Sequence, residues 1–274
     1  MSLTTYARTT IANSVWGGDT FTPPTNWHVI PVTAVADADA GSVTEASGVS
    51  RVSVANNSTS FPNASGTTTV TKTTGIEVET TNLGSTQTVV GIAIFDAATG
   101  GNCWVVIELS ASVEITSGNP YTIPIGGITI TSNPGSPHQN LTTFAIARIL
   151  DSAFGGAALN PPTTYHFAVL TAISDAAAGT GTQATGVARV GYANNDTTFP
   201  DATGTATVVK TTGIDFQTAA FGTTQTIVGV ALWDSGSGGN CWAMRSLNTP
   251  RQVQAGNPFK IAAGDLDWNQ TVAA

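Results

Sequence analysis

Charged side chains are scarce in this chain of 274 residues. Asp, Glu, Lys and Arg together make up 9% of it, against about 25% in an average globular protein. Apolar residues make up 41%, which is more than an intrinsically disordered chain usually contains. Gly, Thr, Ala, Ser and Asn fill the gap, and the apolar residues fall in many short runs. This composition indicates a mainly β protein with a polar, uncharged surface, which is common in proteins that work outside cells or in virions.

Basic residues are particularly few. The chain has nine Lys and Arg residues against 17 Asp and Glu residues, so its formal charge is −8. Binding to nucleic acid through phosphates needs clustered cations, so we expect no nucleic-acid partner. The first 139 residues carry three basic and nine acidic side chains, and the remainder carries six and eight. The two halves therefore differ in charge and could differ in role.

Long hydrophobic runs are also missing. No apolar run approaches the ~20 residues that a membrane-spanning helix requires, so we expect no membrane association. The N-terminal segment MSLTTYARTTIANSV lacks the basic region and apolar block of a signal peptide. We expect synthesis in a cytoplasm and exit by another route, such as inside an assembled particle.

An internal duplication covers almost the whole chain. Lys72-Thr73-Thr74-Gly75-Ile76 matches Lys210-Thr211-Thr212-Gly213-Ile214, and every matching pair is offset by 138 residues. Because one repeat has the usual length of a domain, we predict a first domain over 1–131 and a second over 140–274. Residues 132–139, rich in Pro, Gly and Ser, are the predicted linker.

Each repeat begins with a predicted helix. Leu141, Phe144 and Ile149 recur at helical spacing, and Ser2 and Asn140 are candidate N-caps. The pairs at 17–18 and 155–156 are glycines, which end helices readily. Short runs of β-branched and aromatic residues follow, separated by Gly, Asn and Pro. The predicted fold is two tandem β-sandwich domains, each preceded by a short N-terminal helix.

The chain has only two cysteines, Cys103 and Cys241, which occupy equivalent positions in the sequence GGNCW. Equivalent positions lie in different repeats, so we expect the two residues to be too far apart for a disulfide. Neither cysteine has further Cys or His residues at metal-ligand spacing, so a metal site is not indicated. The interpretation we favour is a small buried residue at the start of a core strand.

The turn that precedes each cysteine has a defined pattern. Asp96 with Gly100 and Gly101 predicts a tight turn, because glycine adopts positive φ and Asp bonds the loop's own N–H groups. Asp234, Gly238 and Gly239 repeat the pattern. One Asp per turn offers too few oxygens for calcium, so we predict no metal and no cofactor.

Two arginines recur at equivalent strand positions, Arg51 and Arg189. An arginine that is partly buried in a strand needs a partner, and Asp96 and Asp234 are the candidates. The alternative is an exposed contact to a neighbouring subunit.

Lys72 and Lys210 are two of only three lysines. They raise the alternative of an intramolecular Lys–Asn amide bond assisted by Glu77 or Asp215, which would require these groups to be buried together.

Motifs for catalysis are missing. The chain has no nucleophile elbow, no phosphate-binding glycine loop before a helix and no H-E-x-x-H. We therefore predict no catalytic residues and no enzymatic activity. Exposed aromatic residues could contact a ligand or partner, and Trp27, Tyr165 and Trp233 are the candidates, although strand aromatics more often belong to a core.

The order of motifs in each repeat carries a family resemblance. L-T-T-[YF]-A is followed by G-G, P-P-T, A-x-x-D-A, [ST]-G-V-x-R-V, N-N-x-T-x-F-P and [FW]-D-x-x-x-G-G-N. One copy resembles small virion proteins of tailed bacteriophages, described as tail-fibre-like or head-decoration proteins. This chain departs by carrying two copies, and by Gly48-Val49-Ser50-Arg51 where the family usually has a tyrosine.

The resemblance implies a non-enzymatic structural protein of a phage particle, made in the bacterial host's cytoplasm and located in the virion. Its partners would be the major capsid protein or other virion proteins, and it would form a homo-oligomer on the particle. We expect a capsid decoration protein that binds the outer face of the capsid lattice. The alternatives are a tail or head fibre component that binds the host surface, and a secreted bacterial adhesin or a carbohydrate-active module.

Overall fold

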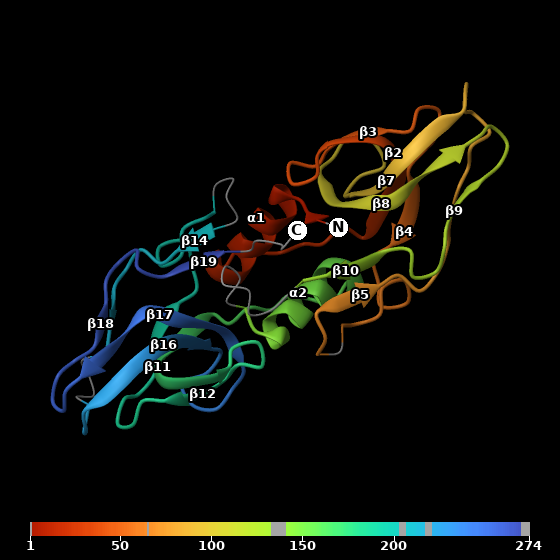
Figure 1. The fold of residues 1–274 in the computed structure, drawn as a ribbon. Helices are drawn as coiled ribbons and strands as arrows, with labels where there is room; N and C mark the ends of the chain where they lie inside the picture. The colour runs from red at the N-terminus through yellow and green to blue at the C-terminus, as the bar shows by residue number, and fades with distance from the viewer. Residues whose placement is uncertain (1, 65, 133–140, 203–206, 217–220, 270–274) are drawn as a thin grey trace.

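The computed structural model describes residues 2–64, 66–132, 141–202, 207–216 and 221–269. The protein is mainly β and has two similar halves, as the sequence predicts. Figure 1 shows one β lobe at each end and the two main helices side by side between them. Within the described residues, no helix is long and apolar enough to cross a membrane.

The first repeat opens with a short strand and a helix and continues entirely in strands. The elements are β1 (Ser2–Leu3), α1 (Thr5–Ala12), its π-helical extension η1 (Asn13–Gly17), β2 (Asn26–Asp37), β3 (Ser42–Glu45), β4 (Val52–Ala55), β5 (Thr69–Thr71), β6 (Ile76–Val78), β7 (Gln87–Phe95), β8 (Cys103–Ile115), β9 (Tyr121–Ile123) and β10 (Thr129–Thr131).

The second repeat follows the same order. Its elements are α2 (Thr143–Gly155), β11 (Thr164–Asp175), β12 (Thr180–Gln183), β13 (Val190–Ala193), β14 (Thr207–Val209), β15 (Ile214–Asp215), β16 (Gln225–Trp233), β17 (Cys241–Val253), β18 (Lys260–Ile261) and β19 (Asp267–Asn269).

Each repeat has two antiparallel layers. The main sheet of the first repeat runs β1-β8-β7-β2-β3, with β4 also paired to β2. The pairs β5–β10 and β6–β9 form a second, narrow layer. In the second repeat β12-β11-β16-β17 with β13 forms the sheet, and β14–β19 and β15–β18 form the narrow layer. Apolar residues on the facing sides of the layers, such as Val29, Ile94 and Ile130, belong to one buried cluster.

The helices begin at threonines. The Thr4 hydroxyl accepts a hydrogen bond from the Ala7 N–H at 3.3 Å and donates to the Cys103 carbonyl at 2.6 Å, so it caps α1 and ties it to β8. Thr142 does the same for α2. The prediction of Ser2 as N-cap was wrong, because Ser2 pairs with β8 as part of β1. Asn140, the other predicted cap, lies outside the described residues.

The helices end at the predicted glycines. Gly18 (φ 80°) and Gly156 (φ 69°) adopt the left-handed conformation that closes a helix. Each of these glycines also touches the opposite repeat. A Cβ on Gly156 would lie 2.5 Å from the Asn56 carbonyl oxygen, and one on Gly18 would lie 2.6 Å from that of Asn194.

The C-terminal end of each helix packs into the other repeat. The Trp27 indole N–H in β2 donates to the Ala153 carbonyl at the end of α2, at 3.2 Å. The Tyr165 hydroxyl, at the equivalent position in β11, donates to the Val15 carbonyl in η1, at 2.9 Å. Their rings contact the aromatic residue one position further along the opposite helix. The two repeats therefore exchange the same contacts in both directions.

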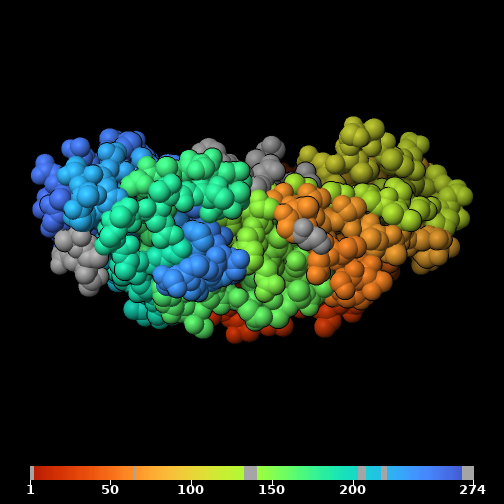
Figure 2. Space-filling model, turned by 90° about the horizontal axis from the view of Figure 1, so that it is seen from below, coloured from red at the N-terminus to blue at the C-terminus, as the bar shows by residue number. Residues whose placement is uncertain are grey.

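The hydrophobic core includes the helix residues that each repeat inserts into the other. Phe154 is fully buried against Trp27 and Phe61 of the first repeat, and Trp16 is fully buried against Tyr165 and Phe199 of the second. The largest cluster of buried apolar side chains is accordingly continuous through both repeats. Figure 2 shows α2 lying at the surface between the strands of the two lobes.

Candidate functional site

The turn before each cysteine is organised by one aspartate. Asp234 Oδ1 accepts from the Asn240 backbone N–H at 2.7 Å, and its Oδ2 accepts from the Asn240 side-chain amide at 2.9 Å. Asp96 bonds Asn102 in the same way in the first repeat. A Cβ on Gly239 (φ 74°) would lie 2.2 Å from Asp234 Oδ1, so this position accepts only glycine.

The paired glycines of the two turns share one backbone conformation. Gly100 and Gly101 have φ of 60° and 69°, and Gly238 has φ of 61°. Only the second glycine of each pair is crowded, because a Cβ on Gly100 or Gly238 would meet nothing within 4 Å.

Each turn is also bonded by one of the two repeated arginines. Arg51 donates to the carbonyls of Ala97 and Gly100, both at 2.7 Å. Arg189 donates to the equivalent carbonyls of Ser235 and Gly238. Each guanidinium stacks on the aromatic ring at the end of the preceding strand, at 3.5 Å for Arg51 on Phe95.

The expected carboxylate partners of these arginines were wrong. Arg51 pairs with Glu45 rather than with Asp96. Arg189 donates to the side-chain amide oxygen of Gln183 rather than pairing with Asp234. The reason is geometric, because both oxygens of each aspartate are already used within its own turn.

Two of the three candidate surface aromatics are not at the surface. Trp27 and Tyr165 are both 0% exposed, because the opposite helix covers them. The expectation that they contact an external ligand was therefore wrong. Trp233 is half-buried beneath Arg189, whose guanidinium carbon lies 4.0 Å from the ring centroid.

Both cysteines are buried and free. Burial raises the pKa of the Cys103 thiol to about 11 and that of Cys241 to about 12. They stay protonated at neutral pH and are poor nucleophiles.

Both repeat lysines are buried too. The Lys210 ammonium donates to the Thr212 carbonyl, and Lys72 makes the same bond to Thr74. Asp215, the candidate to assist an amide bond at Lys210, instead pairs with Lys260 at 3.0 Å.

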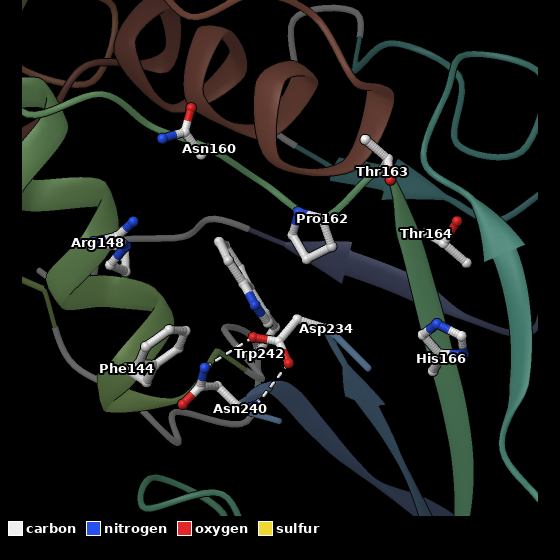
Figure 3. Close-up of a pocket in the computed structure, with 10 residues that line it drawn as sticks. All are labelled: Phe144, Arg148, Asn160, Pro162, Thr163, Thr164, His166, Asp234, Asn240 and Trp242. Atoms are coloured by element: carbon white, nitrogen blue, oxygen red, sulfur yellow. Dashed lines mark hydrogen bonds between the residues drawn. The ribbon is translucent and has the colours of Figure 1, made fainter. Parts of the chain in front are cut away.

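A pocket of about 740 Å³ opens in the second repeat, beside the Asp234 turn. Figure 3 shows α2 on one side of it, β11 on the other, and the turn with Trp242 at its base. Its lining is Phe144, Arg148, Asn160, Pro162, Thr163, Thr164, His166, Asp234, Asn240 and Trp242.

Polar groups dominate this pocket, with one aromatic wall. The Phe144 ring stands edge-on to Trp242, with centroids 5.7 Å apart and planes at 82°. Trp242 is only 2% exposed, so Phe144, which is half-buried, is the ring that a ligand would meet. Arg148 is exposed on the same face of α2 and has no ion-pair partner among the described residues. A ligand with hydroxyl or acidic groups would find hydrogen-bonding side chains on three sides.

The equivalent surface of the first repeat is built differently. Thr10 stands at the position of Arg148, so the cation is missing there. Phe21 replaces Leu159 and packs on Trp104, with centroids 6.1 Å apart. The Trp104 indole N–H also donates to Asp96 at 3.2 Å, whereas Trp242 Nε1 is buried without a partner. The pocket as described is thus a property of the second repeat.

Phe144, Arg148, Asn160 and Asn240 were not recognisable as a group from the sequence. The signal that could have found them lies in the repeat comparison. Arg148 and Asn160 are positions where the two copies differ in chemistry, with Thr10 and Thr22 in the first repeat.

The structure also brings together three exposed carboxylates from the two repeats, those of Asp19, Asp196 and Asp201. Desolvation and the repulsion of Asp19 and Asp196 raise the pKa of Asp201.

Comparison with known families places the protein among fibre proteins of tailed phages. Both repeats match one family model, described as podophage GP4 fiber I protein gp80, over residues 2–131 and 140–269. The chain belongs to this family, and the resemblance to phage virion proteins predicted from its motifs is confirmed. No curated protein matches the chain.

Proposed function

We propose that the protein is a fibre component of a tailed-phage virion that binds the host cell surface. The observation that supports this most directly is the match of both repeats to a fibre family. That match favours the fibre interpretation over the capsid decoration role that the sequence first suggested. The protein would act by binding rather than catalysis, after synthesis in the host cytoplasm.

The pocket beside Asp234 is the receptor contact in this proposal. It combines the half-buried Phe144 ring with side chains that donate and accept hydrogen bonds, among them Arg148, Asn160 and Asn240. Ligand pockets commonly join an apolar wall to a few convergent polar groups, and a cell-surface saccharide offers both kinds of surface. The first repeat, with its own charge balance, would contact other virion proteins or further copies of the chain.

Cell binding by the purified protein tests the proposal. Fluorescently labelled protein should bind host cells saturably, and Arg148→Thr, which copies the residue of the first repeat, should weaken binding about tenfold. Arg251→Thr removes an equally exposed charge outside the pocket and should bind like the wild type. If labelled protein does not bind host cells, the host-surface role is wrong.

Copy number distinguishes the fibre role from capsid decoration. A fibre component should be present in tens of copies per purified particle, and a lattice-binding decoration protein in hundreds, as measured by quantitative mass spectrometry. A count in the hundreds, together with binding to empty capsids, would favour decoration instead.

A further inference from the structure

The buried lysines of the two repeats donate to the same threonine oxygens, but only one of them lies against an aromatic ring. In the second repeat the Lys210 ammonium donates to the carbonyl and hydroxyl oxygens of Thr212. Above it lies the Tyr192 ring, whose centroid is 3.8 Å from Lys210 Nζ. The Tyr192 hydroxyl donates to the Gly213 carbonyl at 3.0 Å. The phenol therefore makes two contacts, one through its face and one through its hydroxyl.

In the first repeat the phenol is missing, and Val29 stands where the second repeat has Phe167, whose ring packs edge-on against Tyr192. The hydrogen-bond partners of the lysine are kept. Lys72 donates to the same two oxygens of Thr74 and is 3% exposed. Gly75 stands where the second repeat has Gly213, and Val54 stands where it has Tyr192. Among the side chains that the structure describes, none donates a hydrogen bond to the Gly75 carbonyl, and no ring lies over the Lys72 ammonium.

A pocket occupies the space that this exchange leaves. It measures about 260 Å³ and opens between β4 and β6. Val54, Lys72 and Gly75, the counterparts of Tyr192 and of its two partners, all line it. Exposed residues at its rim, Ser53 and Glu77, make it reachable from outside. The second repeat thus shows, within the same chain, which group such a space accepts.

We propose that the pocket at Lys72 is a binding site for a phenol ring, namely a tyrosine side chain of a partner protein. The ring would lie over the Lys72 ammonium as Tyr192 lies over Lys210, because a cation is attracted to the face of an aromatic ring, most strongly where water is excluded. Its hydroxyl would donate to the Gly75 carbonyl. The site is separate from the Asp234 pocket and does not depend on the proposed host-surface role.

Burial also lowers the pKa of Lys72, as expected for a cation with no carboxylate partner. A π ring compensates this loss of hydration without bringing a negative charge into a protein whose formal charge is already −8. An anionic group would neutralise the ammonium equally well, so the test includes one.

A titration of the intact, isotope-labelled protein with 4-methylphenol, followed by NMR, tests the site. We expect saturable shifts at 53–55 and 72–77 in the wild type. They should be absent in Val54→Tyr, which places the ring of the second repeat in the first. Tyr192→Val should add a second set of shifts at 190–192 and 210–213. Shifts that persist unchanged in Val54→Tyr would overturn the proposal.

Two further probes need no variant. 4-Methylcyclohexanol has the same size and a hydroxyl but no π face, and we expect at least tenfold weaker binding. Acetate tests the anion alternative. Equal binding of the cyclohexanol, saturable binding of acetate alone, or no saturable shift with 4-methylphenol would each show that the pocket is not a phenol site.

Discussion

Single residues in the two repeats perform one task with different chemistry. Trp27 and Tyr165 occupy equivalent positions, and both donate a hydrogen bond to a carbonyl at the end of the opposite helix. An indole N–H and a phenol O–H are both polar groups at the tip of a large apolar ring, so either residue fills the core and satisfies a buried carbonyl. The sequence identified both as possible ligand contacts, because aromatic identity alone does not indicate which surface covers a ring.

The buried Lys210 predicts a specific pH dependence of stability. Burial lowers the pKa of Lys210 to about 8, so between that value and its unfolded value of about 10.4 the unfolded chain binds more protons. Stability contributed by this residue therefore rises with pH in this window. Between pH 8 and 9 the increase should be about 1 kcal/mol.

Chemical denaturation of wild type and Lys210→Met at pH 8 and 9 measures this effect. The difference between the two proteins should shift by about 1 kcal/mol across that interval, while Lys260→Met, at an exposed lysine, should track the wild type. Burial also raises the pKa of Cys103 and of Cys241, which acts in the opposite direction over the same interval. All three proteins keep both cysteines, so this contribution cancels in the difference. An unchanged difference would contradict the assigned pKa.

At the scale of elements, each helix serves two repeats. Thr4 fastens the beginning of α1 to β8 of its own repeat, and η1 ends against the second repeat. The helix signals in the sequence located the elements well, since the Gly-Gly stops and the apolar stripe are local properties. Which repeat receives the end of each helix is a long-range contact that no local pattern encodes.

Gly156 has a positive φ and also lies close to the Asn56 carbonyl of the opposite repeat. Replacing it, and comparing with a glycine that has only the positive φ, separates these two constraints. Gly156→Ala should lower the free energy of unfolding by about 3 kcal/mol, from positive-φ strain together with overlap on the Asn56 carbonyl. Gly118→Ala is the matched control, because Gly118 has a similar φ of 81° but a Cβ there would meet nothing within 4 Å. It should lose only about 1 kcal/mol. Urea denaturation compares the two, and equal losses would mean that the cross-repeat contact contributes nothing.

At the scale of the whole molecule, the duplication forms an internal pair with approximate two-fold equivalence. Helix α2 contacts β5 of the first repeat and α1 contacts β14 of the second, and β5 and β14 are equivalent strands. Contacts that are repeated in both directions are the mark of a two-fold interface between subunits. Here both partners belong to one chain, so association of the halves is intramolecular and does not depend on protein concentration.

Cutting the chain between the repeats tests this arrangement. A protease site inserted into the predicted linker at 132–139 should be cleaved without separating the halves, since Trp16 and Phe154 remain buried in opposite repeats. The cleaved protein should run at the mass of the intact chain by size-exclusion chromatography with light scattering. In a Trp27→Ala variant, the same cut should let part of the protein separate into fragments of lower mass. Fragments that separate fully from the otherwise wild-type protein would show that the core is not shared.

The candidate site illustrates the limit of prediction from sequence. Asp234 and its glycines were recognisable because a turn needs specific residues within a few positions. Arg148, Asn160 and Asn240 belong to three different segments and meet only because α2, the segment before β11 and the turn converge. The partner of Arg51 was missed for a related reason, because the sequence does not reveal that Asp96 is already bonded to Asn102.

The sequence by itself determined the mainly β class, the two repeats, the C-terminal ends of the helices and the phage virion family, because composition, spacing and repetition can be read from the chain without knowing its long-range contacts. Only the tertiary structure decided that each helix ends in the opposite repeat, that Trp27 and Tyr165 are covered, and that Lys72 and Lys210 have different neighbours. Packing brings distant residues into contact, so only the folded chain shows that Tyr192 covers one buried ammonium while Val54 lines a pocket beside the other.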